Sequence, residues 1–286
     1  MCVKQRIKNV MKKVFPLPAR KQREIENRLL TELQQIHSEN SILRKEISSL
    51  QKTLLRIQNI VLDTNLISYE NVYANVFHDT TIESDWLKDK VFWPGRSALG
   101  YPAMYVTYRI LNELKPKRIL ELGLGQSTKL ISQYAAKNPT VEHTVVESNQ
   151  DWINFFSNSY HLPKNTKIEK LDYKIIPYKN SETRVFDGFK EKFSGKKIDF
   201  ILIDAPLGVD MKEYSRIDVL NILPECIDGD FIILIDDTER LGETNTLAEI
   251  RKALESNSIM YAEGSYGGMK RSTLICSVNL SFLATL

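Results

Sequence analysis

The sequence predicts an α/β protein: a mostly parallel, seven-stranded sheet with an antiparallel C-terminal hairpin, preceded by an N-terminal α-helical coiled coil. Three patterns in the 286 residues lead to this fold class. A heptad repeat fills residues 29–61, strand-like apolar runs alternate with helical patterns from residue 118 onward, and the last two runs flank a glycine-rich turn. Alternating strands and helices are typical of a parallel sheet that is covered on both faces.

The net charge of +3 is the sum of a basic N-terminal arm and a mildly acidic remainder. Residues 1–23 hold eight Lys or Arg and no acid, so the remainder carries 39 − 8 = 31 basic against 36 acidic residues. Apolar residues in 3–15 recur at the helical period until Pro16 and Pro18 end the pattern. We expect a basic amphipathic helix over residues 1–20 that favours an anionic membrane surface, with packing on the chain's own body or on a partner as the alternative. The near-neutral total argues against a protein that coats nucleic acid.

The composition predicts a cytoplasmic protein. No run approaches the roughly 18 apolar residues that a membrane span needs, and the N-terminus lacks the apolar core of a signal peptide. The three cysteines have no metal-binding spacing and are odd in number, which is typical of a reducing compartment. Together with the basic arm, this predicts a peripheral position on the inner face of a membrane.

A heptad seam predicts a coiled coil over residues 21–62. Its positions are spaced alternately by four and three residues, and they are Leu29, Leu33, Ile36, Asn40, Leu43, Ile47, Leu50, Leu54, Ile57 and Val61. This strict 3.5-residue average is typical of a supercoil, and a buried Asn at one a position, here Asn40, favours a parallel dimer. We expect a homodimer; a long helix laid on the chain's own body is the alternative. Residues 63–97 have no clean period and are expected to form a connector.

The globular body is expected over residues 98–286. Its strand-like runs are 118–122, 143–147, 166–171, 197–204, 230–236, 259–263 and 272–278. A first helix is expected near 102–111, and helical patterns occupy 127–136, 151–160, 215–227 and 245–256. In such a Rossmann-like sheet, ligands bind outside the carboxyl ends of the strands. The residues that follow the strands are therefore the candidate site residues.

The first strand runs into a glycine turn, Glu121-Leu-Gly123-Leu-Gly125-Gln-Ser127. Glycines let the backbone turn sharply and come close to a ligand. A nicotinamide cofactor is disfavoured, because its fingerprint wants a third small residue where this chain has Thr128. Glu121, two residues before the first glycine, instead indicates a cationic or amino-acid-bearing ligand.

An acid ends or follows each of the second to fifth strands, and these acids are Glu147, Asp172, Asp204 and the pair Asp236-Asp237. Glu147 lies 147 − 123 = 24 residues beyond the first glycine, where an acid can accept both hydroxyls of a ribose. Because unpaired carboxylates are costly to bury, such a row predicts a ligand site rather than a feature of folding alone.

Taken together, the glycine turn and the acids that follow successive strands resemble class I S-adenosylmethionine-dependent methyltransferases over roughly residues 98–280. The resemblance implies S-adenosylmethionine (SAM) as the cofactor. It implies that Glu121, Gly123 and Gly125 line its methionine end, and Ser127 is a further candidate for cofactor binding. It also implies that Glu147 holds the ribose and Asp172 flanks the adenine.

Two further segments, Asp204-Ala-Pro-Leu-Gly208 and Asp236-Asp237-Thr-Glu-Arg240, are similar to polysaccharide O-methyltransferases of the glucuronoxylan 4-O-methyltransferase type. This similarity implies methyl transfer to a sugar hydroxyl of a cell-surface polysaccharide or its precursor. That family has His-Asp where this chain has Asp236-Asp237, so either Asp204 or Asp237 is the candidate base.

The acceptor is expected to meet side chains from three other segments. Arg96 and Arg240 could face an acidic or phosphorylated acceptor, as could Lys270. Tyr266, in the glycine-rich turn, could form a wall of the acceptor pocket.

Two alternatives use the same residues differently. Asp204, Asp236 and Asp237 could bind Mg²⁺ and polarise the hydroxyl, as in metal-dependent O-methyltransferases of small molecules. Otherwise the coiled coil could be the functional part, with a degenerate, non-catalytic methyltransferase fold attached to it as a scaffold.

Overall fold

The computed structural model describes residues 10, 18–95 and 97–286. It divides the chain into two compact units, Met1–Leu62 and Asp63–Leu286. Most of the basic helix expected over residues 1–20 lies outside the described residues, and so does Arg96. In the part of the chain that is described, no helix is both long and apolar enough to cross a membrane.

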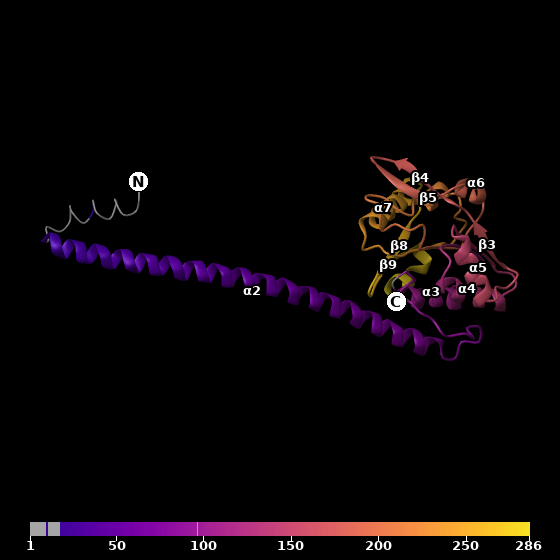
Figure 1. Cartoon of the computed structure of the whole chain (residues 1–286). Helices are drawn as coiled ribbons and strands as arrows, with labels where there is room; N and C mark the ends of the chain where they lie inside the picture. Colours follow the sequence, from indigo (N-terminus) through magenta and orange to yellow (C-terminus); the bar gives the residue numbers. More distant parts are fainter. Residues whose placement is uncertain (1–9, 11–17, 96) are drawn as a thin grey trace. The chain divides into compact units, whose positions relative to one another are not determined.

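A single long helix, α2 (Ala19–Thr81), contains the whole heptad seam (Figure 1). The seam residues in Met1–Leu62 are largely exposed, with Ile47 at 53% and Leu50 at 68%. One copy of the chain therefore leaves an apolar stripe along this unit, and the dimeric coiled coil stays a prediction.

The connector expected over residues 63–97 is helical as far as Thr81. In this stretch Tyr73, Phe77 and Thr81 repeat every four residues, and Phe77 and Thr81 are buried. Tyr73 and Phe77 pack into the core of the Asp63–Leu286 unit. The sequence analysis missed this helix because the heptad stops at residue 61 and a short four-residue repeat replaces it.

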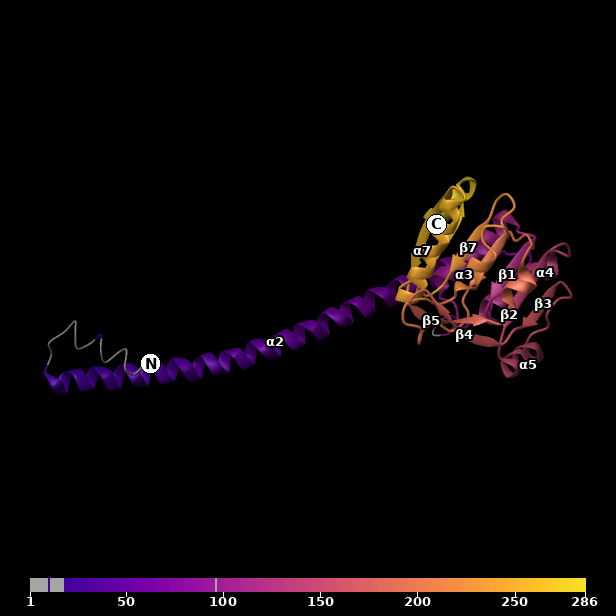
Figure 2. The same cartoon turned by 90° about the horizontal axis from the view of Figure 1, so that it is seen from above.

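A seven-stranded sheet forms the centre of the Asp63–Leu286 unit, with the order β3-β2-β1-β6-β7-β9-β8 (Figure 1, Figure 2). The strands are β1 (Arg118–Leu122), β2 (Glu142–Glu147), β3 (Thr166–Lys170), β6 (Phe200–Ile203), β7 (Ile232–Ile235), β8 (Tyr261–Gly267) and β9 (Arg271–Ser277). The first five are parallel, and β9 is antiparallel to both β7 and β8. The predicted fold class, with its antiparallel C-terminal hairpin, is confirmed.

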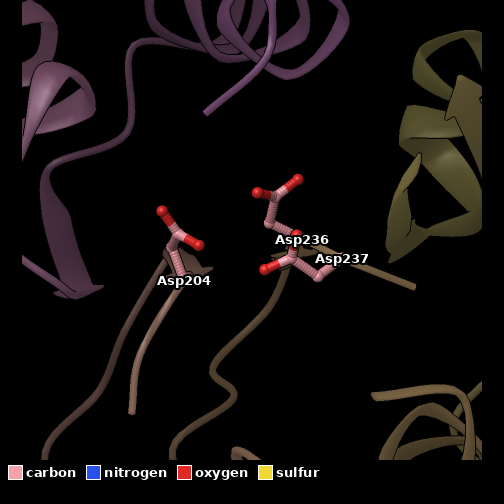
Figure 3. A group of neighbouring side chains, drawn as sticks. All are labelled: Asp204, Asp236 and Asp237. Carbon is pink, nitrogen blue, oxygen red and sulfur yellow. The ribbon is translucent and has the colours of Figure 1, made fainter. Parts of the chain in front are cut away.

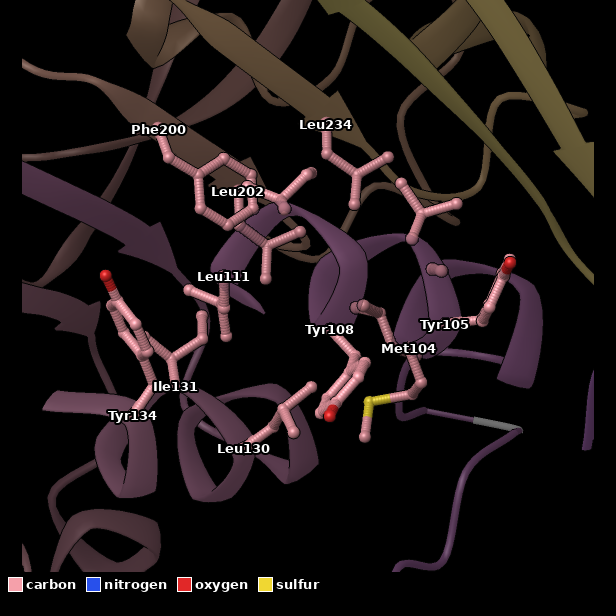
Figure 4. Close-up of a cluster of buried hydrophobic side chains, with 14 of the residues drawn as sticks. Met104, Tyr105, Tyr108, Leu111, Leu130, Ile131, Tyr134, Phe200, Leu202 and Leu234 are labelled. Atoms are coloured by element: carbon pink, nitrogen blue, oxygen red, sulfur yellow. The ribbon is translucent and has the colours of Figure 1, made fainter. Parts of the chain in front are cut away.

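Helices cover both faces of this sheet. One face packs against α3 (Tyr101–Arg109), η1 (Ile110–Leu114) and α4 (Gln126–Lys137), and the other against α6 (Phe189–Phe193), η2 (Ile217–Asn221) and α7 (Leu241–Ser256). Figure 4 shows the first face, where Phe200 and Leu202 meet side chains of η1 and α4. Because neighbouring strand residues point to opposite, equally buried faces, the central strands are continuous apolar runs.

Several elements differ from the prediction or were missed by it, and the short helix α6 is among those missed. The helix expected over 215–227 is only the 3₁₀ helix η2, because Arg216 takes a left-handed backbone conformation (φ 56°) and Pro224 has no N–H to donate. A separate antiparallel hairpin, β4 (Tyr173–Tyr178) and β5 (Ser181–Phe186), follows β3. The chain ends in the 3₁₀ segment η3 (Val278–Thr285).

Candidate active site

A cavity of about 480 Å³ lies at the carboxyl ends of β1, β2 and β6. The strand order reverses here, since β2 and β6 flank β1 on opposite sides, and this is where open α/β sheets bind ligands. The volume falls within the range of about 300–1,000 Å³ that is usual for small-molecule sites. Five of the predicted site residues line it: Gly123, Gly125, Ser127, Glu147 and Asp204.

The glycine turn after β1 forms one wall of the cavity. Gly123 has a positive φ of 106°, and a side chain there would come within 3.2 Å of the Ala205 side chain. Gly125 precedes α4, and its N–H donates to the Thr128 hydroxyl at 3.0 Å. Thr128 therefore caps the start of α4. It occupies the position where a dinucleotide-binding fingerprint needs a small residue. The first backbone N–H groups of α4 remain at the cavity edge, since Gln126 and Ser127 also line it.

Glu147, at the end of β2, has its carboxylate fixed by backbone amides. Oε1 accepts hydrogen bonds from the N–H groups of Ser148 at 2.7 Å and Asn149 at 2.8 Å. Oε2 accepts one from the N–H of Leu124, in the glycine turn, at 3.2 Å. The side chain is buried against the protein but lines the cavity. Its orientation is therefore set before any ligand arrives.

Two aromatic side chains that the sequence analysis missed stand beside Glu147. Trp152, in helix α5 (Gln150–Ser159), donates from its indole N–H to the Leu124 carbonyl at 2.7 Å. Tyr173 opens β4, and both rings line the cavity. Their positions in the sequence could have indicated both aromatic residues. Trp152 lies five residues after Glu147, in the first turn of α5, and Tyr173 directly follows Asp172.

Asp172, by contrast, is not among the residues that line this cavity. Its side chain is 73% exposed and pairs with Lys170. The chain turns at this point into the β4–β5 hairpin, so that Tyr173 faces the cavity instead.

Glu121 lies beneath the glycine turn rather than in the cavity. It is fully buried, accepts a hydrogen bond from the Ser127 hydroxyl, and lies 2.9 Å from the His143 imidazole. Of these residues only Ser127 lines the cavity. Glu121 thus supports the turn from below and does not line the cavity.

Asp204 follows β6 and places a carboxylate in the cavity. Burial, and then the neighbouring Asp236, raise the pKa of Asp204 to about 8, although Arg216 and Lys270 act in the opposite direction. This value lies close to neutral pH, where a side chain can both take up and release a proton.

Asp237, the other candidate base, has a different environment. Burial favours its neutral form, but Arg216, Lys270 and Arg240 together hold the pKa of Asp237 below its ordinary value. It is buried and does not line the cavity. Asp237 is therefore a fixed anion, poorly suited to accept a proton at neutral pH.

Arg216 is a site residue that the sequence analysis did not find. It is buried, with its guanidinium 2.6 Å from Asp237 and 3.2 Å from Asp204. It also donates to the backbone carbonyl of Asp236 at 2.9 Å. One guanidinium therefore joins the ends of β6 and β7. Ser215 precedes Arg216 and Ile217 follows it, and nothing in this local sequence indicates that the arginine is buried.

Of the expected acceptor residues that the structure describes, none lines the cavity. Tyr266 is buried in the core and donates its hydroxyl hydrogen to the Leu283 carbonyl, so it forms no wall of this pocket. Arg240 lies 2.9 Å from Asp237 and does not line the cavity. The mouth carries an exposed Trp93, 71% accessible, and Leu207.

No protein-family model matches the chain, and no curated protein matches it. Several solved structures are similar in fold. An O-methyltransferase from Bacillus cereus in complex with SAH shares 11% identity over 75% of this chain and 96% of its own, with a TM-score of 0.42. The SAH-bound Podospora anserina methyltransferase PaMTH1 shares 17% identity over 73% and 86%, with a TM-score of 0.38.

A SAM-dependent methyltransferase from Aquifex aeolicus is 16% identical over 60% of this chain and 89% of its own, with a TM-score of 0.38. At these identities and TM-scores the likeness assigns no role to any residue of this chain.

The Arg216 network predicts a large loss of stability when its guanidinium is removed. Arg216→Met leaves Asp204, Asp237 and Glu243 buried without their shared cation, and we expect it to lower the free energy of unfolding by about 3–5 kcal/mol. Arg251→Met is the matched control, because it breaks a partly exposed pair with Glu263 and should cost about 0–1 kcal/mol. Urea denaturation measures both, and equal losses would contradict the assigned importance of Arg216.

Proposed function

We propose that the Asp63–Leu286 unit is a SAM-dependent O-methyltransferase. The observation that carries this proposal is the Glu147 carboxylate, which three backbone amides fix at the switch point of the sheet, beside the glycine turn. A carboxylate held in this way can accept hydrogen bonds from the two hydroxyls of a ribose.

The remaining walls of the cavity suit the other parts of SAM. Trp152 and Tyr173 offer aromatic surface beside Glu147 for the adenine. The N–H groups at the start of α4 can bind the carboxylate of the methionine end. Asp204 also lines the cavity, and its carboxyl group can become negatively charged beside a bound cation. When bound, SAM supplies a methyl group on a positively charged sulfur.

We propose Asp204 as the general base that accepts the proton of the acceptor hydroxyl. It is the carboxylate of the acidic cluster that lines the cavity, and its pKa of about 8 lets it take up that proton near neutral pH. Asp237 positions Arg216, which in turn lies 3.2 Å from Asp204. The positive charge of a bound cofactor would favour the ionised, active form of Asp204.

The acceptor we propose is a sugar hydroxyl of a cell-surface polysaccharide or its precursor. The support is the similarity of the segments around Asp204 and Asp236 to polysaccharide O-methyltransferases. A second support is the exposed Trp93 ring at the cavity mouth, a flat apolar surface of the kind that packs against the C–H face of a sugar.

Cofactor binding tests the function directly. Isothermal titration of the full chain should show 1:1 binding of SAM and no heat with NAD. Glu147→Gln should weaken SAM binding at least tenfold, because the neutral amide is a poorer acceptor for the ribose hydroxyls. Asp172→Asn, a change at an exposed acid outside the cavity, should leave the affinity unchanged. A folded protein that binds no SAM would refute the proposal.

The pH dependence of methyl transfer tests Asp204. With a glucuronoxylan-type oligosaccharide as acceptor, kcat/KM should rise tenfold per pH unit below about 8 and level off above it, because the base must be ionised. Asp204→Asn should lower kcat, measured at saturating SAM, by about 10²–10⁴. Asp172→Asn should keep the wild-type profile, and an Asp204→Asn enzyme with full activity would exclude this base.

We also propose that the heptad seam forms a parallel dimer with a second copy of the chain. Its support is the exposed apolar stripe of the Met1–Leu62 unit, interrupted at Asn40. Leu50→Glu places a charge in the seam and should convert a dimer into monomers by light scattering. Leu55→Glu changes an equally exposed leucine outside the seam and should leave the dimer intact. An unchanged particle mass for both variants would exclude the seam as the dimer interface.

A further inference from the structure

Three carboxylates form a cluster that offers the oxygen ligands of a metal site: Asp204, Asp236 and Asp237. One oxygen from each lies within 4.8 Å of the others (Figure 3). Hard divalent cations such as Mg²⁺ bind carboxylate oxygens, but they need them deprotonated and accessible, with room for bound water. Whether a metal fits therefore depends on which protein groups already bind these carboxylate oxygens.

Cationic side chains already contact every carboxylate of the cluster. The Lys270 ammonium lies 3.0 Å from Asp236 Oδ2 and 3.3 Å from Asp237 Oδ1. Arg216 lies 2.6 Å from Asp237 Oδ2 and 3.2 Å from Asp204 Oδ1. Arg240 lies 2.9 Å from Asp237 Oδ1. The other oxygen of Asp236 accepts a hydrogen bond from the Ser272 hydroxyl at 2.5 Å.

The charges of this buried cluster are nearly balanced without a metal. Three acids, Asp236, Asp237 and Glu243, face three bases, Arg216, Arg240 and Lys270, and their sum is 0. Asp204, with its pKa of about 8, is mostly protonated at neutral pH and adds little negative charge. A divalent ion would add two positive charges beside the three that are already there. Since unbalanced buried charge is strongly unfavourable, the cluster does not fit a divalent metal.

We propose that Lys270 is the resident cation of this cluster, taking the place that a divalent metal would otherwise have between Asp236 and Asp237. The cluster of the native protein therefore binds no divalent metal, and Lys270 is a positioning residue that fixes the two carboxylates. Through Asp237 it also fixes Arg216, the partner of Asp204. The inference that methyl transfer needs no metal rests on the proposed function. The inference that the cluster binds no divalent metal does not depend on that function.

The turn between β8 and β9 is built to hold Lys270 in this place. The Gly268 N–H donates to the Lys270 carbonyl at 2.8 Å, and the Met269 N–H donates to Glu70 at 3.0 Å. A side chain at Gly268 would collide with the same Glu70 carboxylate. The charge of Lys270 is secure as well. Burial disfavours it, yet the carboxylates of Asp204, Asp236 and Asp237 raise the pKa of Lys270 above its ordinary value.

Binding of Mn²⁺ to the full chain, followed by electron paramagnetic resonance, tests the proposal. The wild type should leave the signal of free Mn²⁺ undiminished at millimolar metal. Lys270→Met should bind one Mn²⁺ at least tenfold more tightly, because it removes the competing cation and makes the cluster more negative by one charge. Lys270→Arg keeps the charge and should remain metal-free.

Lys129→Met is the matched control, since Lys129 is a buried lysine paired with Asp89 outside the cluster, and it should behave as the wild type. Stoichiometric Mn²⁺ binding by the wild type that Asp236→Asn abolishes would overturn the proposal, whether or not the Lys270 variants fold. A folded Lys270→Met protein without Mn²⁺ affinity would equally overturn it. Failure to bind SAM would refute the proposed function and leave these Mn²⁺ results unaffected.

Discussion

The site depends on one buried guanidinium. Arg216 lies between carboxylates at the ends of two adjacent parallel strands, 3.2 Å from Asp204 after β6 and 2.6 Å from Asp237 after β7. Neither the cation nor the acids could be buried alone at an acceptable cost, so the strand ends and the arginine stabilise one another. Arg216 takes a left-handed backbone conformation directly before the 3₁₀ helix η2.

This network gives similar acids different properties. Asp237 has cations at both of its oxygens and stays ionised, whereas Asp204 lines the cavity and has its pKa raised to about 8 by burial and by Asp236. Glu147 is distinct again, because backbone amides rather than cations fix it. In the proposed reaction these environments separate three tasks: binding the ribose, accepting a proton, and holding the charge of the arginine. Lys270, in the C-terminal hairpin, adds to the same balance of charges. In the proposed account it supplies the positive charge that a metal would otherwise provide.

The sequence predicted what depends on local pattern. Apolar runs of strand length located all seven strands of the sheet, and the spacing from Gly123 to Glu147 located the acid beside the glycine turn, because parallel strands bring their carboxyl ends to one edge. It missed what depends on distant partners. Nothing near Arg216 reveals a pair with Asp237, and a row of acids does not show which of its members faces the cavity. Asp172 was misplaced for this reason, since the chain turns into the β4–β5 hairpin directly after it.

The central claim is that burial among these charges keeps Asp204 poised for proton transfer in the cavity. Its ionisation can be followed by carbon-13 NMR of labelled aspartate carboxylates, with the Asp204→Asn spectrum identifying the signal. The account predicts a midpoint near pH 8 in the free protein and a lower midpoint once SAM is bound, because a cation favours the carboxylate. A midpoint near pH 4, as for an exposed aspartate, that does not move when SAM is added would contradict it.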